Sequence, residues 1–132
     1  MTPPDIASPS SPGGTIAGIG CRAATPAQDI ADLVRRAEAA SGCCVTALAA
    51  PLGKRADIAA AAALLCLPLL AIDDDALAAA QPRCLTRSPA ALRARGVASV
   101  AEGCALAAAG PQSRLILPRI ASARATCAIA AA

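Results

Sequence analysis

Apolar residues along the chain fall into short unbroken runs that alternate with stretches of helical spacing. The unbroken runs predict strands, because strands covered on both faces of a parallel sheet carry apolar residues at nearly every position. These strands cover residues 15–20, 43–50, 68–72, 114–118 and 125–131. Apolar positions that repeat every three or four residues predict helices. With their capping residues, the helices cover 25–41, 55–66, 73–80, 88–96 and 99–109.

Two of the predicted helices begin with a capping box, in which Ser or Thr is followed three residues later by Glu or Gln. Thr25 and Gln28 form the first box, and Ser99 and Glu102 form the second. In such a box each side chain bonds the backbone N–H of the other residue. These residues therefore have a structural explanation before any functional one is needed.

The alternation of strands and helices predicts a layered α/β fold with a largely parallel sheet and a single domain. The last two strands are an exception, because the connection between them is too short for a crossover helix. We expect them to pair antiparallel, which makes the sheet mixed. Ligands of such folds bind beyond the carboxyl ends of the strands. The candidate binding loops are therefore 18–25, 51–57 and the segment around Ser99.

The start of the chain predicts a disordered lead-in, because residues 1–13 are rich in Pro, Ser and Gly. The predicted domain covers 14–132. The lead-in has neither the basic start nor the apolar run of a signal peptide. The longest uncharged apolar run covers 58–72 and contains Pro68, whereas a membrane helix needs roughly 20 apolar residues. We therefore expect a cytoplasmic protein with no membrane partner.

Composition excludes several classes of function. The chain has 39 alanines and no Phe, Tyr, Trp or His. Without His there is no Ser-His-Asp or Cys-His catalytic arrangement and no imidazole metal ligand. Without aromatic residues there is no stacking platform for nucleic acid, and a scattered net charge of +3 is too weak to bind it. A core of small aliphatic residues predicts modest stability, which self-association into a homo-oligomer would raise.

Seven cysteines occur, with no Cys-x-x-Cys pair among them. Four lie in apolar runs, where we expect buried, reduced thiols that pack as small hydrophobic residues. These four are Cys44, Cys66, Cys104 and Cys127. A disulfide framework and a zinc site are the alternatives. Cys21 differs because it lies in the glycine turn beside Arg22, whose charge can lower a thiol pKa. The favoured interpretation is nevertheless a thiol without a role of its own.

The segment from Thr15 to Val34 predicts a strand, a glycine-rich turn and a helix, an order that often binds an anion. Gly18-x-Gly20-x-x-Ala23 fits the dinucleotide-binding pattern. However, the second predicted strand ends without the Asp or Glu that would hold a ribose. The amides of the turn, together with Arg22, would equally suit a carboxylate. A plain strand-to-helix turn with a solvated Arg is the structural alternative.

Five segments, in this order, carry the pattern of one family: "GIGCRAAT", "ALAAPLGKRADI", "LPLLAIDDDAL", "GVASVAEGCALAAAG" and "RLILPRIASARATCAIA". In order and spacing they resemble the cobalamin-biosynthesis CobE/CbiG C-terminal family, from about Thr15 to Ala130. The resemblance implies a three-layer α/β/α sandwich with a mixed sheet and a role in making the corrin ring of vitamin B12. Ala24 stands where the family pattern has Gly, and Arg119 stands where Lys is common.

A corrin precursor carries acetate and propionate arms, so the resemblance implies a carboxylate-binding site at one edge of the sheet. The predicted substrate-binding residues are Gly18, Gly20, Cys21, Arg22, Lys54 and Arg119. Lys54 has a structural alternative, a surface ion pair with Asp57. The first hypothesis is a carrier or accessory factor that binds a corrin intermediate and has other cobalamin-pathway enzymes as partners.

Two alternatives stay open at this stage. Longer CbiG proteins hydrolyse the lactone of cobalt-precorrin-5A, so the resemblance also implies a hydrolase. In that case Glu102 is the candidate general base and Ser99 a hydrogen-bond donor. The glycine pattern leaves a nicotinamide-binding domain as the second alternative. No metal and no cofactor are expected for the corrin-binding hypothesis.

Overall fold

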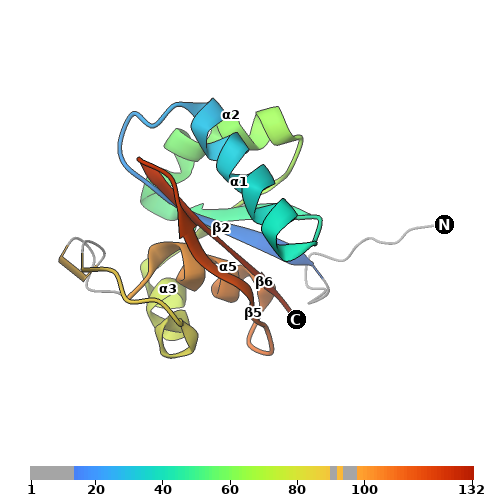
Figure 1. Cartoon of the computed structure of the whole chain (residues 1–132). Helices are drawn as coiled ribbons and strands as arrows, with labels where there is room; N and C mark the ends of the chain where they lie inside the picture. The colour runs from blue at the N-terminus through green and yellow to red at the C-terminus, as the bar shows by residue number, and fades with distance from the viewer. Residues whose placement is uncertain (1–13, 90–91, 94–97) are drawn as a thin grey trace.

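A five-stranded sheet runs through the middle of the protein, with helices on both of its faces (Figure 1). The structure is a computed structural model that describes residues 14–89, 92–93 and 98–132. In spatial order the strands are β4 (Leu69–Ile72), β3 (Ala47–Pro51), β2 (Thr15–Cys21), β6 (Ala125–Ala131) and β5 (Arg114–Ala121). β2, β3 and β4 pair in parallel, and β6 runs antiparallel to both of its neighbours. The predicted mixed, mostly parallel sheet is therefore confirmed.

Two pairs of helices complete the three layers. One face is covered by α1 (Ala27–Ser41) and α2 (Arg55–Leu65), and the other by α3 (Asp74–Ala80) and α5 (Val100–Ala109). Short 3-10 turns are formed by η1 (Leu52–Lys54) and η2 (Gln81–Arg83). Each face of the sheet has its own hydrophobic core, which the helices on that face close off from solvent. The α/β/α sandwich is confirmed.

Two predictions concern parts of the chain outside the described residues. The lead-in at 1–13 is one of them. The other is the helix expected over 88–96, of which only residues 88, 89, 92 and 93 are described. The structure therefore tests the fold from Gly14 onward.

The start of α1 differs from the predicted capping box. Pro26 precedes the helix, and no side chain caps it. The Thr25 hydroxyl instead donates to the carbonyl oxygen of Arg22 at 2.7 Å, and the Gln28 amide donates to Asp32 along the helix. Thr25 therefore stabilises the turn between β2 and α1, because this nearby acceptor competes with the helix for its hydroxyl.

Only one of the two hydrogen bonds of the second predicted capping box forms. Ser99 is the N-cap of α5, and its Oγ accepts from the backbone N–H of Glu102 at 3.2 Å, as predicted. The Glu102 side chain does not return to Ser99, whose N–H donates instead to Gln81 Oε1 at 3.1 Å. The Glu102 carboxylate is therefore available for other partners, which lie at the functional site.

Strand β3 begins at Ala47, four residues later than the apolar run suggested. The backbone N–H of Cys43 donates to Ser41 Oγ at 3.2 Å, and that of Val45 donates to Glu38 Oε2 at 2.8 Å. These bonds tie the preceding segment to the end of α1 and keep it out of the ladder. The apolar pattern could not reveal these polar partners.

Gly18 lies in the middle of β2, directly against α5. A Cβ at this position would overlap the carbonyl oxygen of Ala101 and lie 2.6 Å from the backbone nitrogen of Ala105. The glycine therefore permits close contact between a strand and a helix backbone. The predicted glycine-rich turn is wrong here, since Gly18 and Gly20 are both strand residues paired with β6. The turn that follows begins at Arg22.

The seven cysteines are all free thiols in the described structure, but they are not all buried. Cys104 and Cys127 are fully buried, as predicted. Cys44 and Cys66 are exposed, which corrects the prediction for both. Cys66 ends α2 in a left-handed conformation with φ of 56°, so its side chain leaves the packed face. No group of three or more potential metal-ligating side chains occurs among the described residues.

No helix in the described part of the chain is both long enough and apolar enough to cross a membrane.

Candidate functional site

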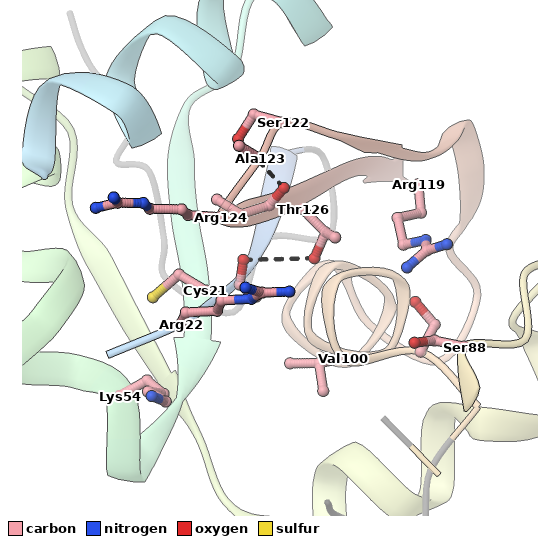
Figure 2. Close-up of a pocket in the computed structure, with 13 residues that line it drawn as sticks. Cys21, Arg22, Lys54, Ser88, Val100, Arg119, Ser122, Ala123, Arg124 and Thr126 are labelled. Atoms are coloured by element: carbon pink, nitrogen blue, oxygen red, sulfur yellow. Dashed lines mark hydrogen bonds between the residues drawn. The ribbon is translucent and has the colours of Figure 1, made fainter. Parts of the chain in front are cut away.

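A pocket of about 580 Å³ opens at the carboxyl ends of β2 and β3 (Figure 2). Loops of parallel strands meet at this edge, and β6 begins and β5 ends here because they run antiparallel to each other. The N-terminus of α5 forms the floor between the two sides. The lining residues are Gly20, Cys21, Arg22, Lys54, Ser88, Ser99, Val100, Arg119, Ser122, Ala123, Arg124, Ala125 and Thr126.

Hydrogen bonds hold two distant segments side by side at the pocket. The backbone N–H of Arg22 donates to the carbonyl oxygen of Arg124 at 2.9 Å. The Thr25 hydroxyl lies 3.4 Å from the same carbonyl, and the Thr126 hydroxyl donates to Gly20 at 3.4 Å. The turn after β2 and the hairpin between β5 and β6 are therefore joined. This contact joins the backbones of Arg22 and Arg124, from which the two side chains point in opposite directions (Figure 2).

Among the described residues, four cationic side chains line the pocket, and no carboxylate does. Arg22 and Arg124 are exposed, while Lys54 and Arg119 are half-buried. Lys54 Nζ lies 3.8 Å from Oδ2 of the exposed Asp57 carboxylate, so the predicted ion pair is present. An exposed pair of this kind leaves the ammonium free to interact with another anion, because solvent screens it. The pocket therefore carries a positive potential.

Glu102 lies beneath the pocket wall and does not line it. Its side chain is 0% exposed. Oε1 accepts from the backbone N–H groups of Leu85 and Thr86, each at 2.8 Å, and Oε2 accepts from the N–H of Arg119 at 2.9 Å. Burial raises the pKa of this carboxyl, but the hydrogen bonds from Arg119, Thr86 and Leu85 together lower it below its usual value. The carboxylate is thus ionised and fully occupied by the protein.

Most of the predicted site residues gather around one pocket. Gly20, Cys21, Arg22, Lys54, Ser99 and Arg119 all line it. Gly18 does not, because it is covered by α5, and Glu102 does not, because its carboxylate is buried.

The sequence prediction missed Arg124, Ser122 and Thr126 among the pocket residues. The sequence did predict the short antiparallel hairpin that contains them. Once its second strand pairs with β2, the loop of this hairpin lies beside Arg22. Only the order of strands in the sheet was lacking, and that order depends on pairing between the two ends of the chain.

Cys21 faces the pocket, but its thiol is not activated. Partial burial raises the pKa of the Cys21 thiol; Lys54 opposes this rise and Asp57 adds to it. The neighbouring Arg22 therefore does not lower the pKa of this thiol, and the alternative of an activated Cys21 is wrong. In Figure 2 the Arg22 side chain points away from the Cys21 sulfur, so the two residues are neighbours in sequence without their charged and thiol groups being close together.

The fold and the pocket together define a three-layer α/β domain with a positively charged site at the carboxyl edge of its parallel strands. The chain belongs to the family described as cobalamin synthesis G C-terminus, whose pattern matches residues 15–130. It is a CobE/CbiG-like protein of cobalamin biosynthesis.

Relatives support this assignment. Protein CobE of Sinorhizobium sp. is 37% identical over 122 residues, which are 89% of this chain and 79% of that protein. The crystal structure of CobE, a protein from the cobalamin (vitamin B12) biosynthetic pathway, matches with a TM-score of 0.85 and 34% identity over 92% of both chains. Cobalamin biosynthesis protein chiG from Agrobacterium tumefaciens is 43% identical and matches with a TM-score of 0.72, over 89% of this chain and 97% of that one.

Proposed function

We propose that this protein binds a corrin-ring intermediate of cobalamin biosynthesis through the carboxylate arms of the ring, as a carrier or accessory factor. One observation carries the proposal: in the part of the chain that the structure describes, four cationic side chains and no carboxylate line a single pocket at the ligand-binding edge of the sheet. Arginine guanidinium groups bind carboxylates in a bidentate manner, and lysine supplies a further charge. The membership in a cobalamin-biosynthesis family supplies the chemical class of the ligand.

The size of the pocket suits part of a corrin. Small-molecule sites usually measure roughly 300–1,000 Å³, and this pocket of about 580 Å³ lies within that range. We expect it to take one edge of the macrocycle with its arms, while the rest of the ring stays in solvent. The N-terminus of α5, where Ser99 and Val100 line the pocket, adds a favourable partial positive charge.

Catalysis and dinucleotide binding have less support than binding. A general base needs a carboxylate oxygen within reach of a water in the pocket, and both oxygens of Glu102 already accept hydrogen bonds from the protein. The glycines of the dinucleotide pattern lie inside β2 rather than at the N-terminus of α1. Corrin binding without turnover therefore remains the function that this geometry favours.

The test is a titration of the purified protein with hydrogenobyrinic acid, followed by visible absorbance and by co-elution in gel filtration. The protein has no aromatic residue, so the absorbance belongs to the ligand alone. We expect Arg22→Ala to weaken binding about fivefold or more through loss of a charged hydrogen bond. The matched control is Arg114→Ala, which removes an exposed Arg from β5 at the opposite end of the sheet and should leave binding unchanged.

Absence of bound pigment at about 50 µM, or roughly −6 kcal/mol, would refute the proposal. Mass spectrometry of the recovered ligand separates a carrier from an enzyme. For this comparison the ligand is a lactone-bearing precorrin-5A-type precursor rather than hydrogenobyrinic acid, which has no lactone to open. An unchanged mass supports the carrier, whereas a gain of one water from the opened lactone would establish the hydrolase instead.

A further inference from the structure

Resting on the proposed function, we propose that Arg119 takes one ligand carboxylate side-on through its Nε–H and one terminal N–H, and that Glu102 is the positioning residue for Arg119. The site then has two ends with different tasks. Arg119 fixes one carboxylate in direction, whereas Arg124 and Lys54 attract others at the opposite end. The Arg22 side chain extends between the two ends (Figure 2). This would make Arg119 the residue that sets which arm of the ring enters the pocket first.

A bulge in β5 places Arg119. Leu117 pairs with Ile129 and Ile120 pairs with Cys127, so β5 advances three residues while β6 advances two. One extra residue therefore lies between these pairs, at Pro118–Arg119. A bulge releases backbone groups from the ladder and redirects a side chain. Pro118 has no N–H to lose, which makes it well suited to such a position.

Glu102 provides the acceptor that the bulge requires. The backbone N–H of Arg119 donates to Glu102 Oε2 at 2.9 Å. The other oxygen of the same carboxylate holds the N–H groups of Leu85 and Thr86. One buried charge therefore joins α5, the β5 bulge and the segment that leads to Ser88. This carboxylate therefore positions the backbone of Arg119, which lines the pocket, whereas the backbone N–H of Ser88 donates to the carbonyl oxygen of Ala98 at 2.7 Å.

The Arg119 side chain retains donor capacity toward a ligand. Its Nε is buried, and it has no hydrogen-bond acceptor among the described residues. A ligand oxygen therefore reaches the Nε–H only when the guanidinium turns toward the pocket. Buried donors in folded proteins are nearly always paired, and a guanidinium is a costly group to leave unpaired. Nε–H and the adjacent terminal N–H point in the same direction and match the two oxygens of a carboxylate.

The placement of the other cations explains why one residue would set direction. Figure 2 shows Arg119 beside Ser88 on one side of Val100, and Lys54 and Cys21 on the other. Arg22 and Arg124 are exposed, so their long side chains can follow a ligand rather than orient it. A rigid fork at one end and mobile charges at the other suit a ligand with several separated carboxylates.

The first test compares two lysine substitutions in the hydrogenobyrinic acid titration. Lysine keeps the charge but lacks the fork, so Arg119→Lys should weaken binding about tenfold. Arg22→Lys, the matched control, should change it less than about threefold, because an exposed charge needs no fixed geometry. Equal small effects would overturn the inference while leaving the proposed function intact. Failure of the unsubstituted protein to bind would instead remove the proposed function.

The second test observes Arg119 directly by NMR of the arginine Nε–H groups. Comparison with Arg119→Lys identifies its signal among those of the eleven arginines. We expect this signal to move downfield and to exchange more slowly with solvent when hydrogenobyrinic acid is added. No change in this signal at saturation would overturn the side-on contact.

Glu102→Gln tests the positioning role in the same spectra. We expect it to shift the free-state Arg119 signal and to weaken corrin binding at temperatures well below unfolding. The control is Glu38→Gln, which breaks another carboxylate-to-backbone bond, to Val45, away from the pocket. It should lower stability without either effect. If Glu102→Gln behaves like this control, Glu102 is structural only and the positioning role is wrong.

Discussion

The two faces of the sheet are packed by different means. On the α1 and α2 face, branched side chains such as Ile30, Leu33 and Ile58 fill the space between helix and strand. On the α5 face, Gly18 lets the backbones of strand and helix approach closely. Branched side chains such as Leu77 and Leu106 also fill the core on the α5 face, but there the close contact between strand and helix additionally requires a position without a side chain.

The two faces also differ in what they contribute to the site. α5 carries Ser99 and Val100 at the pocket and holds the buried carboxylate of Glu102 beneath it. The α1 and α2 face has no fully buried charge among the described residues. Defects on the α5 face should therefore reach the pocket, whereas defects on the opposite face should affect stability alone.

The largest effect is expected for Gly18→Ala. The added Cβ would overlap the Ala101 carbonyl oxygen, and neither backbone can move without separating α5 from β2. We expect a loss of about 3 kcal/mol or more in the free energy of unfolding, measured by urea denaturation. Hydrogenobyrinic acid binding should weaken as well, because α5 carries part of the pocket. Gly53→Ala is the control, since a Cβ there meets nothing within 4 Å. A fully stable Gly18→Ala protein would show that α5 is free to shift.

Leu33→Ala should destabilise the protein slightly less than Gly18→Ala and, unlike it, should leave corrin binding unchanged. Leu33 is 2% exposed on α1, and its truncation leaves a cavity that costs about 3 kcal/mol. Corrin affinity should stay unchanged at temperatures where the protein remains folded. Leu64→Ala, at a side chain that is 50% exposed, should cost only about 0.5 kcal/mol. A loss of binding in Leu33→Ala would mean that the two faces are coupled through the sheet.

Acid should produce the smallest of the three effects. Burial raises and hydrogen bonds lower the pKa of Glu102, with a net lowering from the ordinary value of 4.5. The stability that Glu102 provides is therefore complete above about pH 4.5 and is lost as the pH falls through the lower folded-state pKa. Thermal unfolding between pH 7 and 3 should show this loss in the unsubstituted protein and a flatter profile in Glu102→Gln. Identical pH profiles would mean that other groups control acid stability.

The sequence predicted the layers well because periodicity reports burial. The antiparallel end of the sheet followed from a connection too short for a crossover, and Asp73 caps α3 as expected, accepting from Ala76 at 2.8 Å. The wrong predictions, for the first capping box and for the start of β3, arose where a nearby polar group took the hydrogen bond that the pattern assigned to a helix or strand. The Thr25 hydroxyl donates to the carbonyl oxygen of Arg22 instead of accepting from an N–H of its own helix. The N–H of Val45 donates to Glu38 rather than to a strand partner.

The site was harder to predict than the fold, because its contacts join distant parts of the chain. The rule for strand ends pointed to the loops that hold Arg22 and Lys54, and the family resemblance added Arg119. The structure brings all three to one pocket. Gly18 was misread, because a glycine that admits a helix and a glycine that forms a turn look alike in sequence. The position of Arg119 in a bulge could not be predicted, because the spacing of apolar residues does not show where the pairing of β5 with β6 becomes irregular.

The pairing of β2 with β6 has a practical consequence for modular assembly. Thr15 faces Ala131 at one end of this pair, and Cys21 faces Ala125 at the other, beside the pocket. A tag, a surface tether or a neighbouring domain joined before Thr15 or after Ala131 therefore departs from the side of the sheet opposite the pocket. Both ends of this domain can serve as attachment points while the mouth of the binding site stays open.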